Sequence, residues 1–182
     1  MSASTRTFHD PAWTLRSGPL RMRPTQVADL EFIRRVESDP QNAPHVEQWS
    51  SAEHGAALER GDCFHAVLET AEAAEPVGYL ILEGLEDPDR QVLLRRVAIA
   101  RKGRGFGRAA VQLAARYAFE VAEARSLWLT VAPDNRRAAG LYARLGFVDR
   151  GPYRDPDTGR EVAPPMRLMV RERSPDRPQR GG

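Results

Sequence analysis

Residues 97–108 read Val-Ala-Ile-Ala-Arg-Lys-Gly-Arg-Gly-Phe-Gly-Arg, an apolar run followed by three glycines at alternate positions. Glycine can adopt positive φ and carries no Cβ, so the backbone at Gly103, Gly105 and Gly107 can pass close to a ligand. The helix expected to follow has unpaired N–H groups and a positive dipole end in its first turn, and both favour an anion. Further positive charge comes from Arg101, Lys102, Arg104 and Arg108. The stretch therefore predicts a strand, a phosphate-binding loop and a helix.

Two common phosphate-binding loops do not fit this stretch. A P-loop ends in Gly-Lys-Ser or Gly-Lys-Thr, and neither tripeptide occurs in the chain. A dinucleotide-binding loop has the spacing Gly-x-Gly-x-x-Gly and an acidic residue at the end of a second strand. Here the spacing is Gly-x-Gly-x-Gly, and Glu123 falls at the end of the expected helix. The loop belongs to another class.

Composition favours one globular domain. At 182 residues the chain can bury a core without disulfides or metals, and its net charge of +2 gives no support for a nucleic-acid partner. Cys63 is the one cysteine, which excludes an intrachain disulfide, and it is expected to pack as a small hydrophobe. His65, on the same apparent strand, is expected to be a hydrogen-bonded core or face residue. Without a signal-like segment or an apolar run of about 18 residues, we expect a soluble cytoplasmic protein with no membrane partner.

Apolar periodicity predicts the elements and their order. Strands are expected at residues 20–23, 63–69, 77–85, 91–100, 127–131, 147–149 and 166–170. Helices are expected at residues 25–38, 51–60, 106–121 and 135–145. The first helix should begin at Thr25 as its N-cap and bury Val27 with the rest of its apolar stripe. The second should be entered through Ser50 or Ser51, and the last should be capped by Asp134 or Asn135. The short apolar strand at 127–131 is typical of a central strand covered on both faces.

This order predicts an α/β fold with a mixed, mostly antiparallel central sheet of about seven strands and helices on both faces. A strand-helix-strand-helix-strand series places a parallel unit near the middle of the sheet, with the glycine loop at the carboxyl end of one of its strands. We expect an N-terminal arm over residues 1–18, loose or packed through Phe8 and Trp13. A single domain over 19–171 and a disordered tail over 172–182 follow.

Two separated motifs carry a resemblance to a known family. Residues 102–107 match an acetyl-CoA loop of the form Gln/Arg-x-x-Gly-x-Gly/Ala. The second motif comprises Asn135, Ala138, Leu141, Tyr142, Gly146 and Phe147. With this pair the chain resembles the Gcn5-related N-acetyltransferase (GNAT) superfamily over about residues 20–170, in the branch that acetylates N-terminal amines of ribosomal proteins and other small amines. The resemblance implies the acyl-CoA N-acyltransferase fold and direct transfer of an acetyl group from acetyl-CoA to a peptide or small-molecule amine, with no metal.

The resemblance also implies the residues of the co-substrate site. Backbone groups of 97–99 would hold the pantetheine arm and residues 102–108 the pyrophosphate, while Asn135 would be a helix cap, a co-substrate contact or both. Tyr142 would protonate the departing thiolate, although its spacing also fits a tyrosine that only packs on the helix stripe. The complete set is Val97, Ala98, Ile99, Lys102, Gly103, Arg104, Gly105, Phe106, Gly107, Arg108, Asn135 and Tyr142.

The sequence departs from the family pattern in two places. Lys102 stands where the loop has Gln or Arg, and a lysine would neutralise phosphate as a point charge. Many relatives carry a Glu on the strand before the loop that takes the amine proton, but residues 91–102 contain no acid. Because an amine attacks only when neutral, another base is needed. The catalytic candidate is Glu83, with His45 and His54 as alternatives.

The acceptor amine is expected to bind between residues 39–50 and 153–165, the segments that border the acceptor site in the family. Its charge and an aromatic contact could be supplied by Glu47, Trp49, Tyr153, Asp155 and Asp157. Residues 155–159 also read as an ordinary turn, in which the acids only shape the backbone. A homodimer is left open.

Two other functions stay open from the sequence. The missing strand acid suits a non-catalytic acyl-CoA-binding or regulatory module. The arginine-rich loop suits a phosphate or nucleic-acid binder, which the nearly balanced charge disfavours.

Overall fold

The computed structural model describes residues 14–174, which form a sheet with helices on both faces. Within these residues eight strands pair in the order β1-β2-β3-β4-β5-β6-β8-β7. The strands are β1 (Leu15–Ser17), β2 (Leu20–Pro24), β3 (Cys63–Thr70), β4 (Pro76–Glu83), β5 (Gln91–Ile99), β6 (Ser126–Val131), β7 (Val148–Pro152) and β8 (Arg167–Glu172). The helices are α1 (Leu30–Ser38), α2 (Ser51–Leu58), α3 (Phe106–Arg116) and α4 (Arg136–Arg144). A 3-10 turn (Val27–Asp29) precedes α1, and a π-helical turn (Tyr117–Val121) follows α3.

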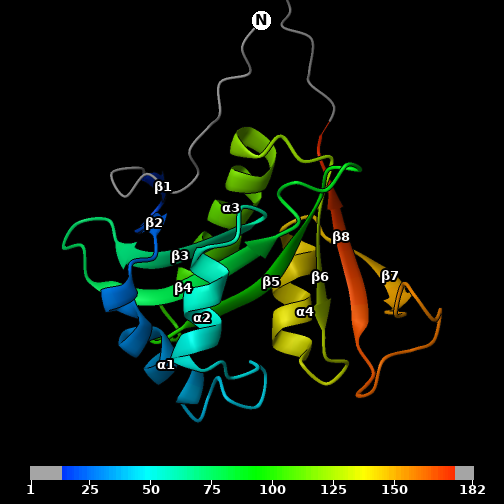
Figure 1. Cartoon of the computed structure of the whole chain (residues 1–182), viewed down its shortest axis with the longest axis horizontal. Coiled ribbons are helices and arrows are strands. Elements are labelled where there is room, and N and C mark those ends of the chain that lie inside the picture. The colour runs from blue at the N-terminus through cyan, green and yellow to red at the C-terminus, as the bar shows by residue number, and fades with distance from the viewer. Residues whose placement is uncertain (1–13, 175–182) are drawn as a thin grey trace, which may run out of the picture.

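The helices divide between the two faces of the sheet, as Figure 1 shows. Helices α1 and α2 cover β3, β4 and part of β5 on the side that we call the front face, and α3 and α4 lie behind. One apolar core lies under α1 and α2 around Ile33 and Ile81, and a larger one lies between the sheet and α3 around Leu80 and Leu113. The predicted mixed, mostly antiparallel α/β fold is therefore confirmed.

The sheet has one strand more than predicted. β1 lies inside the expected arm, because the turn at Gly18 lets Leu15–Ser17 fold back and pair with Leu20–Met22. Phe8, Trp13 and the tail from residue 175 lie outside the described residues. None of the helices within residues 14–174 is both long and apolar enough to cross a membrane.

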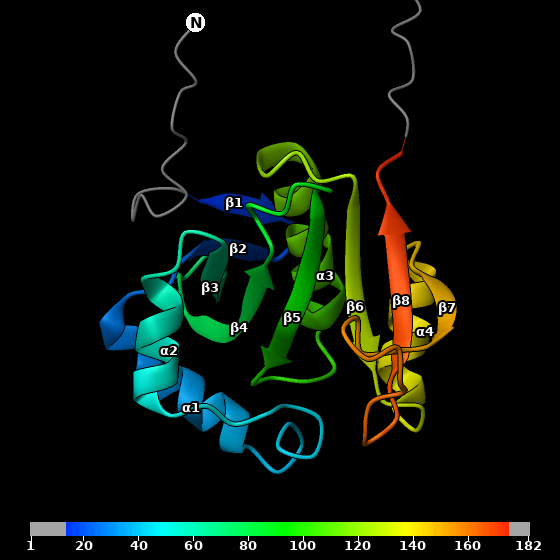
Figure 2. The same ribbon diagram turned by 45° about the vertical axis from the view of Figure 1, so that its right-hand side comes forward.

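The parallel strands β5 and β6 pair over only a short length. Their register runs from Gln91 opposite Ser126 to Leu93 opposite Trp128, and no later pair forms among the described residues. On the other edge of β5, Leu94 pairs with Leu82 and Arg96 with Ile81, so Arg95 is an extra residue in a β-bulge. A bulge bends its strand and increases the local twist. Figure 2 shows the result, with β5 and β6 diverging toward the end of β5 that carries the glycine loop.

Three local predictions need correction. The N-cap at the start of the first helix is Gln26 and not Thr25, because Asp29 accepts a hydrogen bond from the Gln26 backbone while the Thr25 hydroxyl turns inward. Val27 lies in the 3-10 turn and is 76% exposed. β6 is not covered on both faces, because α1 and α2 reach only to β5 and leave Trp128 partly exposed.

Other local predictions are confirmed. Ser50 caps α2 by accepting a hydrogen bond from the Glu53 N–H, and the Glu53 side chain accepts one from the Ser50 N–H. Cys63 is fully buried, and burial raises the pKa of its thiol to about 12, which makes it a poor nucleophile. His65 is also buried, and both of its ring nitrogens have partners.

A buried polar group, which we call the Glu37 cluster, lies between the sheet and the front helices. It consists of Glu37 on α1, His54 on α2, His65 on β3, Tyr79 on β4 and Arg96 on β5, each less than 9% exposed. Glu37 Oε1 accepts hydrogen bonds from Tyr79 at 2.5 Å and from Arg96 Nη1 at 3.0 Å, and it lies 3.3 Å from His54 Nε2. His54 Nδ1 in turn lies 3.0 Å from His65 Nε2.

The environment of the cluster fixes the charge of two of its members. Burial by itself would raise the pKa of Glu37, but the contacts with His54, with Tyr79 and with the Trp49 N–H outweigh it and hold that pKa below its usual range. Burial, together with the neighbouring His54 and Arg96, lowers the pKa of His65 to about 3. Glu37 is therefore ionised and His65 neutral at physiological pH.

The neutral state of His65 makes stability depend on pH. Below about pH 6.5 the unfolded chain binds a proton at this ring that the folded protein does not bind, so the unfolding free energy falls as pH falls. We expect His65→Gln to reduce the slope of unfolding free energy against pH between about pH 6.5 and 4.5, by up to ~1.4 kcal/mol per pH unit. Urea unfolding across this range measures the slope, and His45→Gln, at an exposed position, is the matched control. Equal slopes in the two variants would contradict the assignment.

Candidate active site

The glycine loop presents free backbone donors at the start of α3. Gly103 and Gly105 adopt φ of +80° and +75°, which glycine adopts without strain, and a Cβ built on either would meet open space. Gly105 is the N-cap of α3 and has no side chain to accept the first-turn N–H groups. Gly107 differs from the prediction, because it lies inside α3, where a Cβ would come 3.7 Å from Leu141 of α4. The loop and the first turn of α3 suit an anion.

Two of the four cations predicted around the loop have a protein partner. Arg101 forms an ion pair with Glu75, and the ammonium of Lys102 donates one hydrogen bond to the Asn42 side chain, which leaves its charge unpaired by any acid within residues 14–174. Burial lowers the pKa of Lys102. Arg104 and Arg108 are exposed and form no ion pair within residues 14–174. Within the described part of the chain, these two arginines present fully unpaired guanidiniums to an anion at this loop.

Asn42 connects the glycine loop to the front layer. It is 4% exposed, and its amide group donates to the Val36 carbonyl at 2.8 Å and to the Ile99 carbonyl at 3.3 Å. Its side-chain oxygen accepts from Lys102. The end of α1, the end of β5 and the glycine loop therefore meet at one buried amide, which the sequence did not single out.

The open edge of β5 leads to this loop. Beyond Leu93 the edge that faces β6 has no strand partner among the described residues, so peptide groups of Val97–Ile99 are available to another chain-like molecule. The pantetheine arm of acetyl-CoA carries amides that can pair in this way, and its pyrophosphate would then reach the first turn of α3. The unpaired edge and the uncapped helix fit the co-substrate that the resemblance implies.

Helix α4 lies beside this edge on the back of the sheet. Asn135 is its N-cap and accepts a hydrogen bond from the Ala138 N–H at 3.2 Å, which confirms the predicted cap. Tyr142 is partly buried against the large core and packs on Phe147, with ring centroids 5.7 Å apart. Burial raises the pKa of Tyr142 to about 12, so its hydroxyl stays protonated. Within the described residues this hydroxyl makes no hydrogen bond, which leaves it available to a ligand.

On the front face, the bulge carries two arginines and a carboxylate. The Arg95 and Arg96 guanidiniums donate to the same oxygen of Glu47, Oε2, at 3.1 and 3.2 Å. The Arg96 guanidinium also lies over the Trp49 ring, 4.1 Å from its centroid. Glu47 and Trp49 therefore reach β5 from the loop between α1 and α2, where the sequence placed the acceptor wall.

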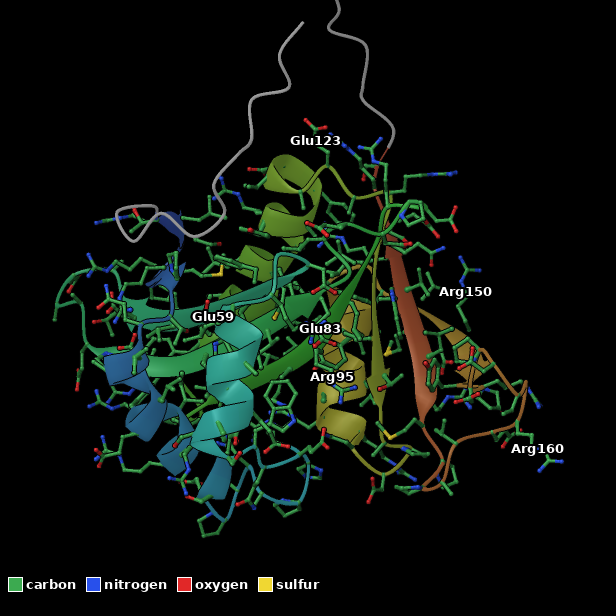
Figure 3. All side chains as sticks on the ribbon, in the orientation of Figure 1. Glu59, Glu83, Arg95, Glu123, Arg150 and Arg160 are labelled. Carbon is green, nitrogen blue, oxygen red and sulfur yellow. The ribbon has the colours of Figure 1, made fainter. Side chains whose placement is uncertain are left out.

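The predicted base, Glu83, lies nearby but has a partner. It follows Ile81 on the front face of β4 and pairs in register with Leu93, whose other neighbour is Trp128 of β6. Its carboxylate accepts from Arg60 Nη1 at 2.9 Å. Figure 3 shows Glu83 and Arg95 on the same side of the sheet, between α2 and β6.

Two aromatic rings complete this side of the site. Trp128 and Tyr153 stack with centroids 5.8 Å apart, which brings the segment after β7 beside β6. Asp155 accepts hydrogen bonds from Asp157 and Thr158 within its own turn, which confirms its role in shaping that turn. His45 is exposed on the loop, whereas His54 belongs to the Glu37 cluster and is buried.

The sequence family and the fold agree. The profile described as "Acetyltransferase (GNAT) family" matches residues 27–147. No curated protein matches the chain in sequence. Among solved structures, the spermidine N-acetyltransferase from Vibrio cholerae in complex with CoA and spermine is 23% identical, with 84% of this chain and 94% of the other covered and a TM-score of 0.70. A chimera of the enzyme from Vibrio cholerae and hSSAT is 23% identical, with 85% and 96% covered and a TM-score of 0.69. At this identity the likeness shows the fold.

A charge placed at Gly105 tests the loop. Asn and Asp both tolerate positive φ, and the open space around this position admits either side chain. We expect Gly105→Asp to abolish detectable acetyl-CoA binding, because its carboxylate would occupy the place of a phosphate. Gly105→Asn, of nearly equal size, should keep affinity within about tenfold, a difference of ~1.4 kcal/mol. Calorimetric titration measures both, and equal affinities in the two variants would contradict the assignment.

Proposed function

Since the chain belongs to the acetyltransferase (GNAT) family and is an N-acetyltransferase that uses acetyl-CoA, we propose that its acceptor is a small aliphatic amine that is cationic at neutral pH. The observation that carries the proposal is the divergence of β5 and β6. Among the described residues it leaves an unpaired strand edge that leads to the glycine loop, and this edge lies next to a front face lined by carboxylates and aromatic rings. Domain boundaries, a cytoplasmic location and a homodimer stay predictions.

The two substrates would approach the open part of the sheet from different sides. The co-substrate would lie along Val97–Ile99, with its pyrophosphate on residues 102–108 beside Arg104 and Arg108. Its acetyl group would then lie near the bulge at Arg95, within reach of an amine bound on the front face. This arrangement supports direct attack of the amine on the thioester.

The charges of the front face support a cationic acceptor. At the bulge the guanidiniums of Arg95 and Arg96 are matched by the carboxylates of Glu47 and Glu37. Around Glu83, two carboxylates share the single guanidinium of Arg60, which leaves an excess of negative charge. The Trp128 ring adds an aromatic face that can attract an ammonium. Structures of this fold include a complex with CoA and spermine, and a polyamine is a cationic aliphatic amine.

Tyr142 is the proposed general acid. The neutral amine forms a bond to the acetyl carbonyl carbon, the carbon–sulfur bond breaks, and the thiolate of CoA takes the hydroxyl proton of Tyr142. The nitrogen loses a proton to solvent as the amide forms, and the Tyr142 phenolate takes one back from solvent. A hydroxyl that is protonated and makes no hydrogen bond within residues 14–174 can serve this purpose.

Binding and turnover test the function together. We expect calorimetric titration to show acetyl-CoA binding, and thiol release to be faster with polyamines and other aliphatic diamines than with N-terminal peptides. Faster thiol release with peptides would show that the acceptor is a protein N-terminus and not a small amine. Binding without release for any amine would favour a non-catalytic acyl-CoA-binding module.

The phenol proton can be tested separately. Tyr142→Phe removes only the hydroxyl and keeps the ring that packs on Phe147. We expect kcat to fall by roughly 10²-fold or more, with the acetyl-CoA Kd unchanged within about twofold. Stopped-flow thiol release and calorimetry measure the two values. An unchanged kcat would show that Tyr142 only packs.

A further inference from the structure

Resting on the proposed function, we propose that Glu47 is the catalytic base, a carboxylate supplied by a loop in place of the missing acid on β5. It would bind the acceptor ammonium and take its proton before the amine attacks. The acceptor class that follows is a primary amine that is protonated in solution. Glu47 had been singled out only as one of several residues that could attract a cation.

β5 itself cannot supply a base at the bulge. The residues that flank the divergence from β6 are Leu93, Leu94, Arg95 and Arg96. Both arginines instead bind an incoming carboxylate, that of Glu47. Where many relatives have an acidic side chain on this strand, β5 therefore carries two arginines at the bulge that bind an acidic side chain from the loop.

The position of Glu47 is set by the buried Glu37 cluster. Glu37 Oε1 fixes Arg96 through Nη1 at 3.0 Å, which leaves Nη2 to hold Glu47 at 3.2 Å. Glu37 Oε2 accepts the backbone N–H of Trp49 at 3.0 Å, and the Trp49 ring packs against the Arg96 guanidinium. The loop is thus attached to the core two residues after Glu47, so this carboxylate is positioned although its side chain is exposed.

One oxygen of Glu47 remains free. Both arginine contacts are made to Oε2, and within residues 14–174 no donor contacts Oε1. The side chain is 63% exposed, so a ligand can reach this oxygen from the front face. Glu83 also has one oxygen without a donor in that range, since Arg60 contacts its Oε1, but its side chain is only 17% exposed. Of the two carboxylates near the bulge, Glu47 is therefore the more accessible to a ligand.

The step balances without any further reactant. The ammonium gives one proton to Glu47 Oε1, and the resulting lone pair forms the bond to the acetyl carbon. The carbon–sulfur bond then breaks, and the sulfur leaves as thiolate and takes a proton from Tyr142. The nitrogen loses its second proton to solvent as the amide forms, the Tyr142 phenolate takes a proton back from solvent, and Glu47 releases its proton to solvent, so that one proton is released overall. The two arginines keep the carboxylate in place while its charge changes.

The pH dependence of Glu47→Gln tests the proposal. In the wild type, a charged amine and an ionised Glu47 react together, so kcat/KM is expected to be nearly constant from about pH 7 to 9 with an aliphatic diamine whose pKa is about 10. The Glu47→Gln variant has no carboxylate at this position to deprotonate a bound ammonium, so it reacts only with the fraction of the amine that is already neutral in solution. Its kcat/KM should be roughly 10²-fold lower or more at pH 7 and should rise about tenfold per pH unit. The acetyl-CoA Kd should stay within about twofold.

Matched controls separate this role from others. Glu59→Gln removes the same charge from an exposed position at the end of α2 and should behave as wild type. A Glu47→Gln deficit that is constant across pH would show a structural role and overturn the proposal. If kcat/KM stayed constant with pH in Glu47→Gln but rose steeply with pH in Glu83→Gln, the base would be Glu83 and not Glu47. Faster turnover of carboxylate-bearing amines by Glu47→Gln would show that Glu47 only blocks Arg95.

The proposed function and this inference fail in different ways. Absence of thiol release by the wild type with any amine would contradict the proposed function. Wild-type release that is matched by Glu47→Gln at every pH would contradict only the role of Glu47.

Discussion

The front half of this protein depends on one buried carboxylate. Glu37 is 1% exposed and remains ionised because Tyr79, Arg96 and the Trp49 N–H donate to it, with His54 beside it. Burying a charge costs several kcal/mol, and removing one partner of a buried pair typically costs about 3–5 kcal/mol. The donors come from two strands and from the loop after α1, with the histidine on α2. These four segments must therefore keep one arrangement for the charge to stay compensated.

A second constraint acts on the sheet. Strands β5 and β6 pair only up to Leu93 and Trp128, and the bulge at Arg95 bends β5 at that point. Among the described residues, the divergence leaves peptide groups along β5 unpaired on one side, and on the front the bulge presents the exposed Arg95 side chain beside the buried Arg96. Because Arg96 is also a member of the Glu37 cluster, the buried charge and the open strand edge meet at the same residue. Buried electrostatics thereby set the geometry of the acceptor side.

Predictions from sequence succeeded where the governing interactions are local. The glycine loop, the caps at Ser50 and Asn135 and the burial of Cys63 depend on a few neighbouring residues or on strand periodicity. Thr25 was wrong as a cap because a residue 40 positions away, His65, binds its hydroxyl. The hydrogen bond from Lys102 to Asn42 was missed for the same reason, since Asn42 comes from a loop about 60 residues earlier.

The sequence alone determined the α/β class, the place of the phosphate-binding loop and membership of an acetyltransferase family, because helix and strand periods, glycines and capping residues act over short distances. It also showed that β5 lacks an acid. Tertiary structure alone decided what replaces it. Glu47 lies almost 50 residues before Arg95 and Arg96 in the chain, and only the packing of the loop over the bulge brings the carboxylate to the two guanidiniums. A charge in an irregular loop carries no periodic signal, so its partner is defined only when the sheet and helices have set the distance between them.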